Sequence, residues 1–173
     1  MNELDSSWHE LLETAVRRAE VSGRTDIVEY LRLKASNDLL RTTAANWLID
    51  SFIEAAFEAA RSRPAIKIER DEPFEFSRGN GKMLGSRLVI TLGVRCLEVR
   101  TGWPRTPSSG ILRGNSLAAA DILHFGLSRH NSLLSLVRGE TTPHWIDEEK
   151  NIADLAFISQ HLAILLGQPE MTI

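Results

Sequence analysis

The sequence has little cysteine and few aromatic residues: Cys96 is the single cysteine in 173 residues, and aromatic residues make up 6%. One cysteine excludes an intramolecular disulfide. The first residues, Met1–Asp5, lack the apolar core of a signal peptide, so we expect a protein of the reducing cytosol. The apolar runs are too short to span a bilayer, and we expect no membrane partner.

Sequence motifs of common enzymes are also missing. The chain contains neither G-x-S-x-G nor H-E-x-x-H. The run Gly79–Lys82 fails as a phosphate-binding loop, because Phe76 stands where the loop needs its first glycine and Met83 where it needs Ser or Thr. The five histidines show no metal-binding spacing. We therefore expect no metal and no cofactor.

What is present is the composition of a folded globular chain, with 43% hydrophobic and 25% charged residues. The length predicts one domain, 1–173. Apolar spacing predicts a helical segment over 1–63, with a short helix from Thr25 to about Ala35 and a long one that starts near 36–38. The apolar stripe of this long helix is too wide for one packing face, which indicates either central burial or a homodimer interface.

From Ala65 the apolar period changes to two, which predicts strands over most of 64–146. Gly93 at a tight turn predicts a hairpin in which Arg87 faces Arg100 and Leu88 faces Val99. A C-terminal helix is expected within 147–167, starting near Asp147 or Asn151. Helices, then an antiparallel meander of five to six strands, then a helix packed on the sheet, define an α+β protein.

The net charge of -3 conceals an uneven distribution. Residues 61–113 carry 11 basic and 5 acidic side chains, whereas the segments on either side are acidic. Arg87 and Arg100 would repel each other across the predicted hairpin unless something neutralises them. The neutralising group is an acid of this chain, such as Glu98 or one from a terminal helix, or a bound anion.

A second cationic feature is the loop 102–110, which holds two prolines and presents Trp103 beside Arg105. Prolines stiffen a loop, and a rigid Trp–Arg pair suits a planar or anionic group. Arg113 follows shortly after. The alternative is a structural loop in which Trp103 fills the edge of the core and Arg105 pairs with an acid.

Two functions follow from these patterns. The first is a binding protein that recognises an anionic small molecule or an acidic protein partner through Arg87, Arg100, Trp103, Arg105 and Arg113. The overall acidity of the chain argues against nucleic acid. The second is a small enzyme or receptor with a pocket near His124 and the 102–115 loop. In this pocket His124 would act as acid or base, and Arg100 and Arg105 would hold an anion. Asp121 or Glu98 would serve as the orienting carboxylate. We favour the binding protein.

Overall fold

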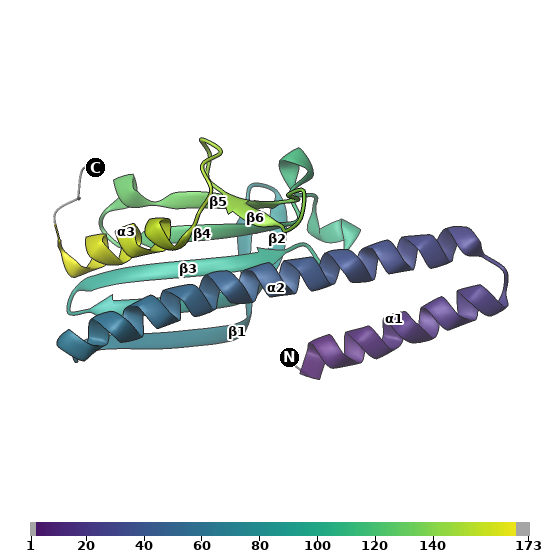
Figure 1. Ribbon diagram of the computed structural model, residues 1–173, viewed down its shortest axis with the longest axis horizontal. Helices are drawn as coiled ribbons and strands as arrows, with labels where there is room; N and C mark the ends of the chain where they lie inside the picture. The colour runs from purple at the N-terminus through teal and green to yellow at the C-terminus, as the bar shows by residue number, and fades with distance from the viewer. Residues whose placement is uncertain (1–2, 169–173) are drawn as a thin grey trace. The chain divides into compact units, whose positions relative to one another are not determined.

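The computed structural model describes residues 3–168, apart from the side chains of residues 3–6, 8 and 113. Within this range the chain forms three α-helices and a six-stranded antiparallel sheet, in the order helices, strands, helix (Figure 1). This confirms the predicted α+β class. Contacts within the chain divide it into two units, residues 1–42 and 43–173. No helix in the described range has both the length and the apolar character that crossing a bilayer requires.

The first unit is a pair of helices joined by a short turn. Helix α1 (Glu3–Val21) is followed by Gly23, whose φ of 68° favours glycine, and by the start of α2 (Thr25–Ser62). Arg32 on α2 donates to Glu20 on α1 at 2.7 Å. The expected break near residues 36–38 does not occur. The polar residues there lie within one continuous 38-residue helix, in which the Asp38 carboxylate accepts from Arg41 at 2.9 Å.

The sheet in the second unit is a simple meander in which each strand pairs with the next. Its strands are β1 (Ile66–Arg78), β2 (Gly81–Leu92), β3 (Arg95–Trp103), β4 (Ala118–His124), β5 (Ser132–Val137) and β6 (His144–Ile146). The predicted hairpin register is confirmed, because Arg87 pairs with Arg100 and Leu88 with Val99.

The core lies between one face of this sheet, called the inner face, and two helices: residues 43–62 of α2, and α3 (Leu155–Leu166) (Figure 1). Leu48 and Phe52 of α2 have no exposed surface. In the second unit, central burial therefore accounts for part of the apolar stripe of this helix, whereas Trp47 and Phe57 of the same stripe stay 41% and 61% exposed. Trp145 on β6 fixes the helix further, since its indole Nε1 donates to the carbonyl of Ala44 at 3.0 Å.

Helix α3 starts later than predicted. Asp154 is its N-cap, and the Asp154 carboxylate accepts from the amide of Phe157 at 3.0 Å. Asp147, which was expected near the helix start, instead closes a turn by accepting from the amides of Glu149 and Asn151. Both aspartates satisfy free amides in the same way, so sequence alone did not distinguish the turn from the helix cap.

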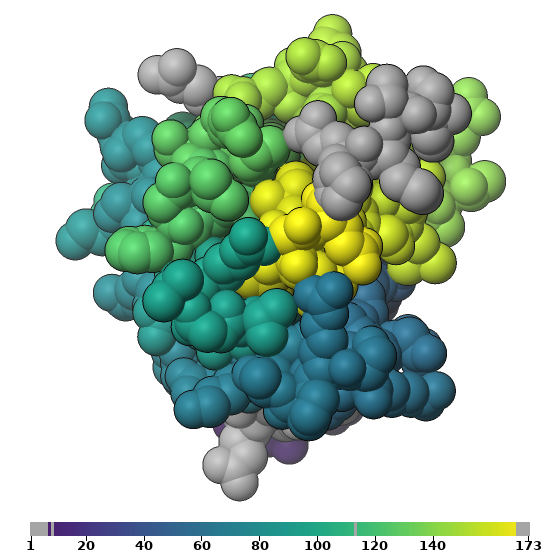
Figure 2. All heavy atoms as spheres, turned by 90° about the vertical axis from the view of Figure 1, so that its left-hand side faces the viewer, coloured from purple at the N-terminus to yellow at the C-terminus, as the bar shows by residue number. Residues whose placement is uncertain are grey.

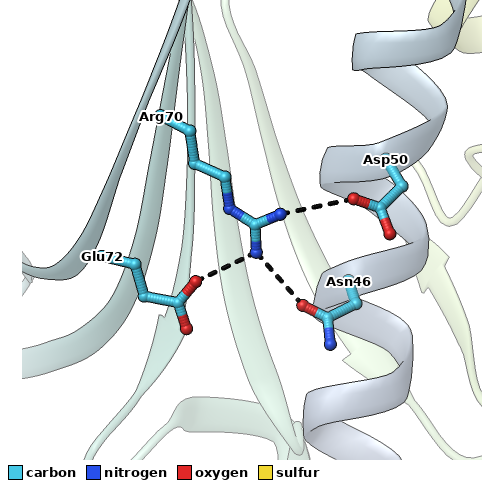
Figure 3. Close-up of polar contacts among 4 residues, drawn as sticks. All are labelled: Asn46, Asp50, Arg70 and Glu72. Carbon is cyan, nitrogen blue, oxygen red and sulfur yellow. Dashed lines mark hydrogen bonds and ion pairs between the residues drawn. The ribbon is translucent and has the colours of Figure 1, made fainter. Parts of the chain in front are cut away.

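A polar contact joins α2 to the edge strand β1. Figure 3 shows the Arg70 guanidinium reaching Asp50 and Asn46 on α2 at 3.4 Å each, and Glu72 on its own strand at 3.0 Å. Arg70 lies on the inner face, opposite Leu88. Because the core ends at this edge strand, a charged side chain there can contact the helix and still reach water.

The far end of the β1–β2 hairpin folds over the opposite face of the sheet, called the outer face. Arg78 on β1 donates to the carbonyl of Leu134 on β5 at 2.6 Å. Four strand spacings of about 4.8 Å separate these strands in a flat sheet, which is beyond the reach of an arginine side chain. On β2, Gly85 lies so close to the neighbouring strand that a Cβ atom there would clash with the carbonyl oxygen of Thr101, and the β1–β2 pairing shifts between Asp71 and Phe74. In the folded-over part of the hairpin, Phe76 and Met83 are buried.

Candidate functional site

The two opposed arginines of the β2–β3 hairpin are neutralised by acids of the sheet itself. Arg87 donates to Asp71 on β1 at 2.9 Å, and its guanidinium lies 4.5 Å from the ring centre of Phe74. The hydrogen bond to Asp71 raises the pKa of Arg87. Arg100 contacts Glu98 and Asp121 at 3.6 Å each. These three acids lie on strands of the sheet. The terminal helices, which were one expected source, supply none of the three.

Asp121 is the most buried member of this outer-face cluster, with 4% of its surface exposed. Its carboxylate lies 3.8 Å from Arg78 and 3.6 Å from Arg100. Burial raises the pKa of Asp121, and the two arginines oppose that rise. Within the described part of the chain, Asp121 Oδ1 and Arg100 Nε make ion-pair contacts but no hydrogen bond. Asp121 is thus the buried centre of a partly exposed charge network.

The loop after β3 places the predicted Trp–Arg pair together, but with the tryptophan inside. Trp103 is 4% exposed and fills the edge of the core, and the Arg105 guanidinium lies 4.0 Å from its ring centre. Thr106 Oγ1 bonds the hydroxyls of Ser108 and Ser109 at 2.9 and 2.8 Å, which orders the loop. The predicted binding residue Arg113 has a side chain outside the described residues.

His124 lies on the inner face, in a buried hydrogen-bonded chain. Its Nε2 is 2.8 Å from Nδ1 of His161 on α3, and Nε2 of His161 is 3.2 Å from the hydroxyl of Ser132. Burial is the main cause that lowers the pKa of His124 to about 4 and that of His161 to about 3. Both rings are therefore neutral at pH 7, and one of the two facing nitrogens donates to the other.

The structure does not assemble the predicted catalytic set. His124 points to the inner face of the sheet. Asp121 on the same strand, and Arg100, which pairs with Asp121, belong to the outer face. The 102–115 loop joins the beginning of β4, and His124 is at its end, about 20 Å away along the strand. His130, by contrast, does lie near His124, with 6.2 Å between the ring centres.

An open groove of about 880 Å³ lies at the end of the sheet where β3 begins and α3 finishes. We call it the end groove. Figure 2 views this end, with the end of α3 in yellow beside the β2–β3 turn in teal and the β4–β5 connection in green. The connection contains the short 3-10 helix η3 (Ser128–His130). Seven residues line the groove: Arg95, Leu127, Arg129, His130, Ile164, Gly167 and Gln168.

The end groove is cationic. None of the described residues that line it is acidic. Neither Arg95 nor Arg129 makes an ion pair with any described residue; Arg95 donates to the carbonyl of Leu165 at 3.4 Å, and Arg129 donates to His130 at 2.9 Å. Gly167 allows the Arg95 contact, because a Cβ atom there would stand 1.9 Å from the guanidinium. Thus two arginines converge where no carboxylate of the described chain neutralises them.

Sequence reasoning missed Arg95, Arg129 and His130 as a group. A usable signal existed, because in an antiparallel meander every second connection returns to the same end of the sheet. The β2–β3 turn and the β4–β5 connection are two such connections, so Arg95 and Arg129 share an end. The same argument does not predict that the end of α3 lines the groove, because the placement of that helix depends on tertiary packing.

The described residues contain no group of three or more His, Cys, Asp or Glu side chains that could hold a metal ion. The histidines near the end groove bond each other and Ser132. In our comparisons with known proteins, no family model matches the chain, and no curated protein or solved structure matches it.

Proposed function

We propose that the protein binds an anionic small molecule in the end groove and acts as a binding protein. The observation that supports this proposal is the convergence of Arg95 and Arg129 on a groove lined by no described acid. A volume of about 880 Å³ lies within the range of small-molecule sites, roughly 300–1,000 Å³. Arginine suits this role because its planar donors match the oxygens of a carboxylate or phosphate.

The end groove is better supported than the arginine-rich face predicted from sequence. There, Arg87 and Arg100 already contact Asp71, Glu98 and Asp121. An anion on that face would have to compete with carboxylates held in place by the strands. The Arg95 and Arg129 side chains face no such competitor among the described residues, so an added anion gains the full attraction of both.

The experiment is a calorimetric titration with inorganic phosphate at low salt. We expect saturable binding by the wild-type protein and at least a fivefold weaker affinity for Arg129→Gln. Arg129 is exposed and donates to its neighbour His130, so the substitution should leave the fold intact. Arg61→Gln is the matched control, because Arg61 is an exposed arginine that does not line the groove. Equal affinities for the two variants would contradict the proposal.

We also propose that the first unit pairs with a second copy of the chain. Among its described side chains, only Leu12, Ala19 and Val28 are buried apolar residues. Tyr30, Leu33 and Leu39 are each more than half exposed. A helix pair of about 40 residues rarely forms a sufficient core alone, and two such pairs make a four-helix bundle.

The assignment to the cytosol stays a prediction.

A further inference from the structure

One wall of the end groove is apolar. Leu127 and Ile164 line the groove together with the two arginines, and Leu127 keeps 37% of its surface exposed. A bare inorganic anion would leave this wall in water. A ligand that carries an apolar part beside its charge would cover the wall and contact the arginines at the same time.

Two further apolar side chains stand in water in the same turns. Val94 directly precedes Arg95 and is 94% exposed, and Phe125 lies two residues before Leu127 and is 79% exposed. The two turns are adjacent, because the amide of Phe125 donates to the carbonyl of Cys96 at 3.0 Å. Apolar side chains gathered around a cationic groove indicate a ligand with both characters.

We propose that the ligand of the end groove is an anionic amphiphile, a phosphate or carboxylate joined to an aliphatic chain, bound as a single molecule. This rests on the anion site proposed above and specifies its ligand. The head group contacts Arg95 and Arg129, and the chain packs along Leu127 and Ile164. The volume of the groove accommodates the head group together with part of a chain.

The test compares octyl phosphate, below its micelle concentration, with inorganic phosphate by calorimetry. Each methylene group that leaves water strengthens binding by about fourfold. We therefore expect octyl phosphate to bind at least tenfold more tightly than phosphate. Leu127→Ser should remove most of this difference. Val21→Ser, a matched change at an exposed valine on α1, should remove none of it.

The outcomes separate the two proposals. If phosphate binds and octyl phosphate binds no more tightly, the amphiphile is wrong and the anion site stands. If neither binds, the anion site itself fails. A third arm uses vesicles of phosphatidylcholine with phosphatidylglycerol. The protein could co-sediment with these vesicles and yet bind monomeric octyl phosphate no more tightly than phosphate. This result would assign the apolar side chains to a membrane surface and overturn the proposed single-molecule ligand.

Discussion

His124 on β4 and His161 on α3 share a 2.8 Å hydrogen bond between Nε2 and Nδ1, with 4% of each residue exposed. This contact fastens the C-terminal helix to the sheet directly behind the end groove, since His130, which lines the groove, lies 6.2 Å from His124. Because both rings are neutral in the folded state, the free energy of unfolding depends on pH.

We predict that the protein loses stability as the pH falls below about 6.5. The unfolded histidines take up protons near that pH, whereas the folded pKa values of His124 and His161 are lowered to about 4 and about 3. The unfolded state therefore binds more protons, and the pair's contribution to stability is complete above pH 6.5 and declines towards pH 4. The two groups together give a slope of roughly 2–3 kcal/mol per pH unit near pH 5.5.

Urea unfolding at several values between pH 5 and pH 7.5 measures this slope. His161→Gln keeps a hydrogen-bonding side chain and removes one titrating group, so it should reduce the slope by roughly half. His9→Gln, at an exposed histidine on α1, is the control and should leave the slope unchanged. An identical slope for wild type and His161→Gln would show that the buried pair does not titrate as described.

A second prediction concerns the buried carboxylate of the outer face. Asp121→Asn preserves the shape of the side chain but leaves Arg78 and Arg100 without their buried countercharge. Breaking a buried ion pair from one side costs about 3–5 kcal/mol. Asp71→Asn also removes an arginine partner, but its pair with Arg87 is half exposed, and we expect a loss of less than about 1 kcal/mol. Comparable losses in urea unfolding would refute the assignment of Asp121 as the buried centre of the network.

A third prediction concerns Gly85 in the β1–β2 hairpin. Gly85→Ala places a methyl group against the carbonyl of Thr101 on the neighbouring strand, so the two strands must separate. We expect a destabilisation of about 2 kcal/mol or more, as for other overpacked sites. Ser77→Ala, at an exposed position on β1, should change stability by less than about 0.5 kcal/mol. A thermal melt of both variants is sufficient, and an unchanged melting temperature for Gly85→Ala would exclude the close approach of Gly85 to the Thr101 carbonyl.

A fourth prediction concerns assembly. If the first unit pairs with a second copy, Leu33→Glu should shift the protein towards a 19.3 kDa monomer in sedimentation equilibrium, because it places a charge in an apolar contact. Leu155→Glu, on α3, changes a similarly exposed leucine in the second unit and should leave the dimer intact. A wild-type protein that stays monomeric at high concentration would rule out the pairing.

The parts of the fold that depend on local patterns were predictable from sequence. Gly93 fixed the β2–β3 register, because a two-residue turn leaves little choice of pairing. The position of Arg78 over the outer face could not be predicted from the sequence, because it depends on close contact between Gly85 and the backbone of a neighbouring strand. The partnership of His124 with His161 joins positions 37 residues apart, and no local pattern encodes it.

The place of the candidate site was not predicted from the sequence, and anion binding there stays a proposal. Arg95, which lines the end groove, does belong to the arginine-rich segment 61–113. The sequence did not reveal which arginines the chain neutralises by itself. Asp71 and Asp121 decide that by their positions across the sheet, opposite Arg87 and Arg100, and those pairings require the register of strands β1 and β4.

The most direct test of the anion site is a nuclear magnetic resonance titration of the labelled protein with inorganic phosphate. We predict that backbone amide shifts change in three segments, 94–97, 126–131 and 164–168, with one shared dissociation constant. Amides beside Arg87, Arg100 and Arg105 should stay unchanged. Shift changes confined to those three arginines would contradict the end groove and return the anion to the sheet and loop, and the absence of any saturable change would contradict anion binding altogether.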